Sequence, residues 1–384
     1  MLAAILTSVF VAACGYGVTF PFLAGRLEEW GVSGVLIGLN AAMPALGWFL
    51  GSFLLPVMQS RTSIRAILVG SLVGAGVAWV AFAVVADYWA WTSIRFVFGG
   101  AIGLFFRSIE FGLNAVTADA HRGRVFGWYS LAFGAGLAVG AALEPLVSAD
   151  RMLPWIVPPV FFVAAVPVAA MWRGDRRAAS ERPTFSGWVA TLREAPVPMV
   201  AGLVYGFGEA VPAYLLSIYA LRNGFGAEVA AHTLSAAALG SITLPLALGV
   251  LADRGGRRGS LVAAAGLAAV TAAAIPFASG AVAAFLGLVT ATSGFSSAIY
   301  AIALALIGER WPAQGLNTAN AAFGASYALG GLIGPLVNGA AIDTLSSQGL
   351  MVSAAVAPAL LAIYVVAAGG SAFAAKGETH EHRH

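Results

Sequence analysis

Charged side chains are scarce in this chain. Only 10% of its 384 residues are Asp, Glu, Lys or Arg, whereas 60% are hydrophobic, and the mean hydropathy is +0.87. A soluble domain carries about 25% charged residues, so this supply does not suffice for a water-facing surface. The long apolar runs show no strand alternation, which favours helices over a barrel. We therefore expect an all-α integral membrane protein.

Residues that usually signal catalysis or cofactor binding are also few. Cys14 is the single cysteine, so neither a disulfide framework nor a thiol redox pair is expected. The phosphate-binding pattern G-x-x-x-x-G-K-[ST] is absent, which leaves ATP-driven transport without support. Outside the tail at 380–384 the only histidines are His121 and His232, and no H-E-x-x-H occurs. We predict no enzyme activity, no metal and no cofactor.

Polar breaks divide the chain into apolar runs that are each long enough to cross a bilayer, which needs about 20 residues. The longest break, 173–194, separates two sets of six runs. We expect an amino-terminal bundle over 1–172, a linker over 173–194, a carboxy-terminal bundle over 195–370 and a tail over 371–384. The expected spans are 2–24, 34–56, 65–86, 89–117, 125–147, 153–172, 195–219, 228–250, 259–279, 281–308, 317–342 and 351–370.

The placement of positive charge orients these spans. If the amino terminus is cytoplasmic, fifteen of the twenty Lys and Arg residues fall in cytoplasmic segments and three fall outside. Short cytoplasmic loops carry such an excess. We expect both termini and the linker in the cytoplasm and a multi-pass protein of the bacterial inner (plasma) membrane. The same arginines account for the net charge of +3, so nucleic acid is not an expected partner.

The chain also repeats itself across its midpoint. Residues 132–147, AFGAGLAVGAALEPLV, and 322–337, AFGASYALGGLIGPLV, share nine of sixteen positions without a gap at an offset of 190. An offset of half the chain, between the fifth span of each set, indicates a parallel duplication about an axis along the membrane normal. Two similar bundles with a site between them are the expected result.

A loop signature points to a known family. Residues 249–258, from Gly249 through Asp253 and Arg254 to Arg257 and Arg258, read GVLADRGGRR. This resembles the loop G-x-L-A-D-R-x-G-R-R of the major facilitator superfamily (MFS) at every specified position. The resemblance implies twelve helices in two pseudo-symmetric six-helix bundles and a loop that latches the cytoplasmic side. We predict that Asp253 interacts with a helix end and with Arg257.

Other segments resemble the same family. The fourth span contains Arg95-x-x-x-Gly99-x-x-x-Gly103, and we expect Arg95 to pair with Glu144 or to line a pathway. Gly330-x-x-x-Gly334-Pro335 predicts close helix packing in the eleventh span. Within the superfamily the chain resembles most the short bacterial branch of YcaD-like and efflux-permease-like members.

In this fold the first and fourth helices of each half line the cavity. Arg107 and Glu110 lie three apart and can pair with each other, while Tyr205 and Glu209 lie four apart on one face. Glu209 has no basic residue within its own span. The predicted cavity residues are Tyr16, Thr19, Arg107, Glu110, Tyr205, Glu209, Ser296, Ser297 and Tyr300.

These observations favour a secondary active transporter of a small organic solute that works by alternating access as a monomer in the lipid bilayer. Protons are the expected coupling ion, carried by Glu209, with Glu110 as the second candidate. The alternative for Glu209 is a static hydrogen bond to a tyrosine such as Tyr300. A non-transporting receptor or assembly factor with this fold, or an intramembrane enzyme, stays open. The cavity favours an uncharged, amphipathic or cationic solute.

Overall fold

The computed structural model describes residues 2–117, 119–172, 185–278, 280–311 and 313–368, with the side chains of some further residues in these ranges left aside. The described part is helical and contains no strand. Eleven of its helical spans are long and apolar enough to cross a membrane, and α6 is a shorter apolar helix of 17 residues. The fold class therefore agrees with the expectation from the sequence.

The first half is a bundle of six helices. They are α1 (Leu2–Glu29), α2 (Gly34–Arg61), α3 (Ile64–Val84), α4 (Tyr88–Val116), α5 (Asp119–Ser148) and α6 (Leu153–Ala169). Several helices extend beyond the apolar runs into polar sequence, as α2 does at Arg61. Membrane helices commonly end in the interfacial layer, where water and headgroups satisfy the terminal backbone groups.

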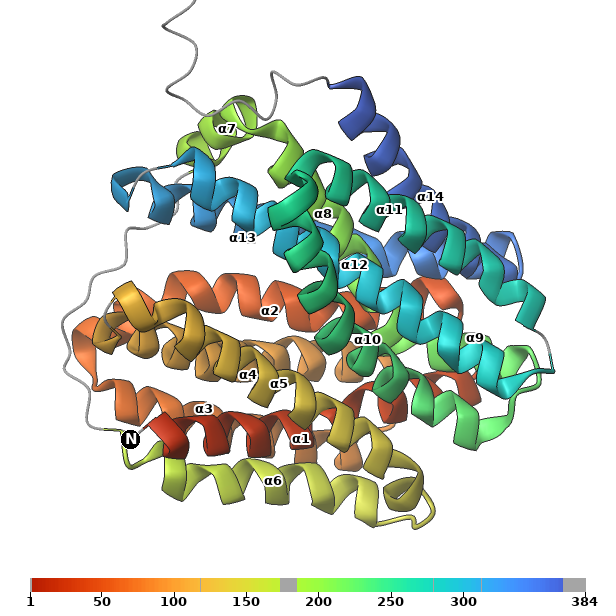
Figure 1. Cartoon of the computed structure of the whole chain (residues 1–384). Coiled ribbons are helices and arrows are strands. Elements are labelled where there is room, and N and C mark those ends of the chain that lie inside the picture. Colours follow the sequence, from red (N-terminus) through yellow and green to blue (C-terminus); the bar gives the residue numbers. More distant parts are fainter. Residues whose placement is uncertain (1, 118, 173–184, 279, 312, 369–384) are drawn as a thin grey trace, which may run out of the picture.

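The second half repeats this arrangement with more interruptions. Its elements are α8 (Pro196–Ala210), η1 (Val211–Leu215), α9 (Leu216–Arg222), α10 (Gly226–Gly255), α11 (Arg257–Ala274), η2 (Ile275–Ala278), α12 (Val282–Arg310), α13 (Ala313–Thr344) and α14 (Gln348–Ala367). The predicted linker 173–194 is not wholly irregular, because its last ten residues form α7 (Phe185–Glu194). Figure 1 shows α7 at one end of the second bundle.

The seventh span is a broken helix. Five residues around Pro212, Val211–Leu215, form a π-helical turn between α8 and α9. Proline lacks the amide hydrogen that would continue the α-helical ladder, and an i→i+5 turn absorbs the extra residue. The turn begins two residues after Glu209 and therefore sets the direction of α9 relative to α8.

The internal repeat reappears as repeated packing. A Cβ added to Gly140 of α5 would lie 2.0 Å from the carbonyl oxygen of Cys14 in α1, and one added to Gly330 of α13 would lie 2.1 Å from that of Leu203 in α8. Positions 140 and 330 differ by the repeat offset. In each half the fifth helix thus packs backbone to backbone against the first, as small-residue motifs allow.

Apolar side chains cover the outside of the molecule. The large exposed hydrophobic residues include Val77 on α3, Val270 on α11, Phe277 on η2 and Leu360 on α14; Phe277 is 89% exposed. So many exposed apolar side chains suit a surrounding of hydrocarbon rather than water. The chain is a multi-pass membrane protein.

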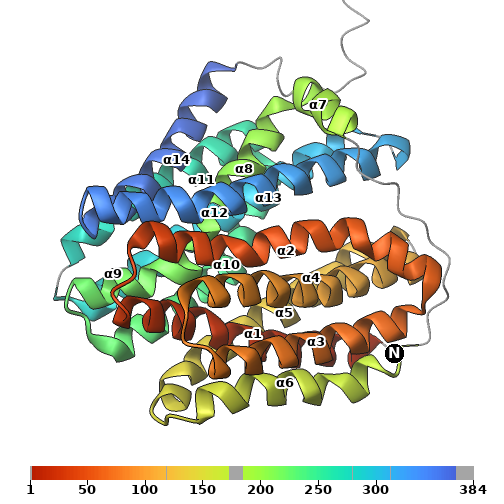
Figure 2. The ribbon, with the colours of Figure 1, turned by 180° about the vertical axis from the view of Figure 1, so that it is seen from behind.

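The two halves meet through α2 with α13 and through α5 with α10. We call the end that carries Glu28 and Asp343 the outer end and the end that carries α7 the inner end. Figures 1 and 2 show α2 and α13 close together at the outer end and further apart toward the inner end. The bundles are therefore splayed at the inner end.

Candidate functional site

A charged cluster lies on the first half, where α4 and α5 meet. Arg107 Nη1 lies 3.2 Å from Glu110 Oε2, so the ion pair expected from their spacing is present. Tyr129 of α5 donates a hydrogen bond of 3.0 Å to Glu110 Oε1. Both oxygens of Glu110 are thereby engaged, one by a charged donor and one by a phenol.

A second acidic residue lies on the second half, where α8 faces α13. Glu209 is exposed, and its Oε2 accepts a hydrogen bond from the hydroxyl of Tyr327. The sequence suggested Tyr300 as a tyrosine partner, but the structure gives this role to Tyr327. An exposed carboxylate midway along a membrane helix requires access to water.

Three tyrosines form a cluster beside this carboxylate. The ring centroids of Tyr205 and Tyr300 lie 4.9 Å apart, those of Tyr205 and Tyr327 lie 5.8 Å apart, and those of Tyr300 and Tyr327 lie 6.0 Å apart. Ser297 is a hydrogen-bonding partner of Tyr205 and is buried, while Ser296 is half-buried. The second half therefore presents an aromatic cluster with one acid at its edge. We call Tyr205, Tyr300 and Tyr327 the tyrosine cluster.

The two groups of residues lie within electrostatic range of each other. Arg107 interacts with Tyr300 and Tyr327 across the interface between the halves, and Tyr300 also interacts with Glu110 and Glu209. The tertiary structure thus joins predicted residues of α4, α8 and α12 in one central site. It adds Tyr129 and Tyr327 from α5 and α13, helices that the sequence analysis did not include in the cavity lining.

A compact aromatic layer lies on the outer side of this site. Tyr214 of η1 packs against Phe20 of α1 at 4.8 Å between ring centroids, and it is a hydrogen-bonding partner of Tyr16 and Arg95. The guanidinium carbon of Arg95 lies 4.9 Å from the centre of the Tyr214 ring. This layer separates the central site from the outer end.

Two sequence expectations are corrected here. Arg95 does not pair with Glu144: Arg95 is buried against Tyr214, whereas Glu144 accepts a hydrogen bond of 2.5 Å from Ser148 on its own helix. Thr19 does not line an open site, because it is 1% exposed and its hydroxyl donates to the Tyr16 carbonyl. Tyr16 is likewise buried, so α1 contributes to the aromatic layer rather than to an accessible wall.

Polar contacts close the outer end. Arg222 of α9 forms a bidentate ion pair with Glu28 of α1, with Nε 2.7 Å from Oε1 and Nη2 2.9 Å from Oε2. Asp343 of α13 accepts hydrogen bonds from the backbone amides of Gly34 and Val35 at the start of α2, at 2.7 Å and 2.8 Å. A carboxylate at a helix amino terminus satisfies free amides and favours the positive end of the dipole. Both contacts join one half to the other.

The predicted latch lies at the inner end. Arg257 forms an ion pair of 2.8 Å with Glu309 of α12, which belongs to the same half. Asp253 and Arg254 fall in the last turn of α10, but their side chains lie outside the described residues, so their latch role stays a prediction. Gly249 has open space around its Cα.

The glycine motif of α13 packs against two helices, one in its own half and one in the other half. Gly330 and Gly334 pack on the backbone of α8, at Leu203 and Phe207, while the Pro335 carbonyl faces Gly38 of α2. One turn of α13 therefore contacts both α8, which carries Glu209, and the opposite half.

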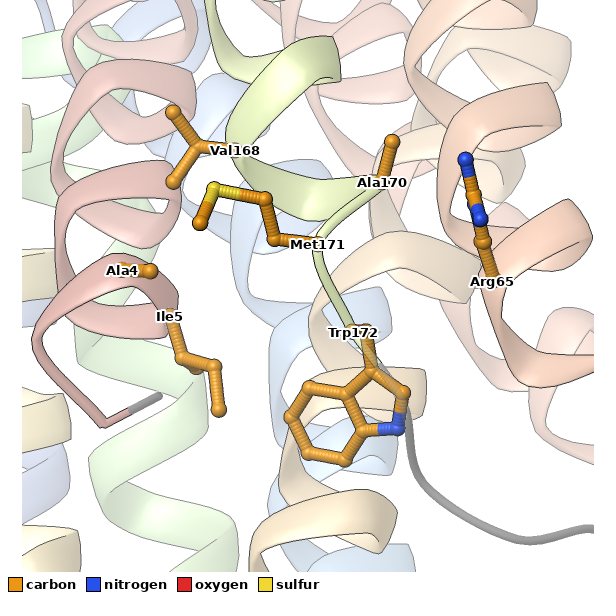
Figure 3. A pocket seen from close by; sticks show the side chains of 7 residues that line it. All are labelled: Ala4, Ile5, Arg65, Val168, Ala170, Met171 and Trp172. Carbon is orange, nitrogen blue, oxygen red and sulfur yellow. The ribbon is translucent and has the colours of Figure 1, made fainter.

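A pocket of about 450 Å³ lies apart from the central site, at the inner ends of α1, α3 and α6. Figure 3 shows Met171 pointing toward Ala4, Ile5 and Val168, with Arg65 on the other side. The pocket is lined by Ala4, Ile5, Arg65, Val168, Ala170, Met171 and Trp172. None of these is a predicted site residue.

Among the described residues no group of three or more His, Cys, Asp or Glu side chains could hold a metal ion. The titratable side chains of the central site are carboxylates, one guanidinium and phenols. Such groups have the chemistry to hydrogen-bond a solute and to take up or release a proton.

Sequence reasoning missed Tyr129, Tyr214, Tyr327, Asp343 and the Glu28–Arg222 pair. A signal existed for some of them, because a tyrosine or charge inside or beside an apolar run is costly without a partner. No local pattern indicates that Glu28 and Arg222, 194 positions apart, form a pair.

Comparisons with known proteins agree with this architecture. A sequence profile described as Major Facilitator Superfamily matches residues 5–290 and 198–378. The chain is 25% identical over 360 residues to the uncharacterized MFS-type transporter YfkF of Bacillus subtilis, covering 89% of this chain and 88% of that one. It is 22% identical to the uncharacterized MFS-type transporter YcaD of Escherichia fergusonii, with 78% of each covered.

Solved structures show the same fold. A mutant of the nucleoside transporter NupG superposes with a TM-score of 0.79 at 13% identity and covers 95% of this chain and 99% of its own. A D-xylose–proton symporter superposes with a TM-score of 0.74 at 13% identity and covers 95% of this chain and 96% of its own. At this identity the likeness concerns the fold alone.

Proposed function

Because the chain belongs to the Major Facilitator Superfamily, we propose that it is a secondary active transporter that moves a small organic solute by alternating access and couples this movement to protons. The supporting observation is Glu209, an exposed carboxylate at the junction of the two halves whose described partner is a phenol. Glu209 is the proposed proton carrier.

The contrast between the two acids supports this assignment. Glu110 is paired with the guanidinium of Arg107 and accepts a hydrogen bond from Tyr129, so its carboxyl group has a cationic partner in this conformation. Glu209 accepts from Tyr327, and an ionised carboxylate without a cation is costly inside a membrane protein. Protonation removes that cost, and a change of exposure between the two sides then moves the proton.

The difference between the two ends of the molecule supports the proposed alternating access. The outer end is joined by Glu28 with Arg222 and by Asp343 with the start of α2, whereas the helices diverge toward the inner end. With a cytoplasmic inner end, this is an inward-facing state. Breaking the outer contacts and closing the inner end would give its counterpart.

The test is solute uptake in proteoliposomes driven by a pH gradient, with a panel of radiolabelled metabolites and drugs. The unaltered protein should accumulate at least one solute, and Glu209→Gln should abolish pH-driven accumulation because glutamine keeps hydrogen bonding but does not titrate. Glu228→Gln, an exposed acid at the outer end of α10, is the matched control. If Glu209→Gln still accumulates solute under a pH gradient, another residue carries the proton, and Glu110 is the first candidate. Absence of any flux would favour a receptor or assembly factor.

A further inference from the structure

The charges of the central site do not balance. Arg107 and Glu110 neutralise each other through their ion pair on the first half. Glu209 belongs to the second half, where it accepts a hydrogen bond from Tyr327 and interacts with Tyr300, as Arg107 and Glu110 also do, and it adds one negative charge when it is ionised. A single positive charge brought by a solute would restore neutrality in a setting where uncompensated charge is costly.

In the part of the chain that the structure describes, no cationic side chain forms an ion pair with Glu209. Several elements pack against α8 and carry titratable groups. The groups that interact with Glu209 are phenols: Tyr300 and Tyr327 on these elements, and Tyr205 on α8 itself. Tyr16 and Tyr214 of the aromatic layer complete the set. The other titratable groups of these packed elements are Arg193, Glu194, Glu309, Arg310, Asp343 and Tyr364.

The two arginines nearest the site are engaged elsewhere. Arg107 is paired with Glu110, and Arg95 lies against the Tyr214 ring. Neither forms an ion pair with Glu209 among the described residues. The carboxylate is thus the unneutralised charge of the site.

The tyrosine cluster is the other group, besides Glu209, that suits a cation. Its three rings lie within 6.0 Å of one another by centroid, two of them nearly parallel at 22° and the third crossing Tyr327 at 69°. Tyrosine faces attract ammonium groups through the ring quadrupole, and clusters of aromatic rings bind quaternary ammonium ions. All three side chains are half-buried and therefore accessible in part.

From this arrangement we infer that the solute is an organic cation, held by Glu209 and the tyrosine cluster, and that the cation and the proton compete for Glu209. This inference rests on the proposed function and names its substrate class. Cation binding displaces the proton of the neutral acid into solvent, and a returning proton displaces the cation. Mutually exclusive occupancy of one carboxylate converts a proton gradient into outward movement of the cation, which is exchange rather than symport.

The test measures binding to the purified full-length chain by titration calorimetry. The probes are tetramethylammonium, choline and benzyltrimethylammonium, with 3,3-dimethyl-1-butanol as the neutral isostere of choline. We expect at least one cation to bind at least tenfold more tightly than the isostere. Its affinity should rise by up to tenfold per pH unit while Glu209 is protonated, with about one proton released, as reciprocal linkage requires. The proton count follows from repeating the titration in buffers of different ionisation enthalpy.

Variants separate recognition from folding. Glu209→Gln should lose at least tenfold in cation affinity together with the pH dependence, whereas Glu209→Asp should retain the pH dependence. Tyr205→Leu should weaken binding more than Tyr205→Phe, because phenylalanine keeps a ring. Glu228→Gln, far from the site, should bind as the unaltered protein does. The inference is overturned if none of the three cations binds more tightly than the isostere, or if Glu209→Gln leaves the cation affinity unchanged.

The outcomes also distinguish the inference from the proposed function. If proteoliposomes accumulate a solute under a pH gradient but none of the cations binds, the cation assignment is wrong and transport stands. If the cations bind with proton release but no solute crosses, the site assignment stands and the transport function is wrong.

Discussion

At the residue scale, the helix contacts depend on the absence of a side chain. The backbones of α5 and α1 approach so closely at Gly140 that an added Cβ would lie 2.0 Å from the Cys14 carbonyl oxygen. That oxygen belongs to a helix backbone and has little freedom to move. The same holds at Gly330 against α8, so the repeated fifth helices are fixed to the first helices at equivalent points.

Gly140→Ala should therefore destabilise the protein by about 1–3 kcal/mol, the usual cost of overpacking. The measurement is the thermal midpoint of the purified protein in detergent. Gly70→Ala is the matched control, since Gly70 lies in α3 with nothing within 4 Å of an added Cβ. Alanine there should be neutral or stabilising, because it improves helix propensity. Equal midpoints for the two variants would contradict the packing argument.

At the element scale, the π-helical turn couples the site to the outer closure. Glu209 precedes the turn, Tyr214 lies in it, and Arg222 ends the helix that follows it. A single broken helix thus carries the proposed proton carrier, the aromatic layer and one side of an outer ion pair. A change of direction at Pro212 would move all three together, which is the kind of role that π-helical turns serve at functional sites.

The amino terminus of α2 is the second outer element that links the halves. Asp343→Asn keeps a hydrogen-bond acceptor for one amide but removes the negative charge at the positive helix end. That interaction is worth about 0.3–1 kcal/mol, so the population of the outer-open state should rise by about two- to fivefold. The population shifts in this direction because the Asp343 contact stabilises only the state in which the outer end is closed.

The shift is measured by electron paramagnetic resonance distances between spin labels at Met152→Cys and Leu345→Cys, which lie in exposed outer loops of opposite halves. The buried Cys14 should not react. Arg26→Gln is the control, because Arg26 pairs with Glu29 on its own helix and joins no second element. A distance distribution unchanged by Asp343→Asn would exclude the contact as an outer latch.

At the scale of the whole molecule, orientation decides what the splayed end means. Arginine and lysine lie mainly in the segments at the inner end, so we predict that this end faces the cytoplasm. Cysteines introduced at Arg61 and Arg193, both exposed at the inner end, should resist an impermeant maleimide added to intact cells, while one at Ala227 should react. Permeabilised cells provide the control for reactivity. Reaction at Arg193 in intact cells would reverse the orientation and turn the inward-facing state into an outward-facing one.

The sequence by itself determined the class of molecule. Scarce charge, long apolar runs, the half-chain repeat and the loop at 249–258 are local or compositional features, and the bilayer converts them directly into spanning helices. The Arg107–Glu110 pair was also predictable, because residues three apart on a helix are neighbours whatever surrounds the helix.

The tertiary structure alone decided the partners of the site. Glu209 meets Tyr327 rather than Tyr300, Arg95 meets Tyr214 rather than Glu144, and Asp343 reaches the start of α2. These contacts join helices more than 100 residues apart, and they depend on the rotation of each helix about its axis and on how far two backbones approach. An almost uniformly apolar membrane helix has little contrast between its faces, so its sequence encodes that rotation weakly. Packing of glycines such as Gly330 against a neighbouring backbone fixes it only once the bundle has formed.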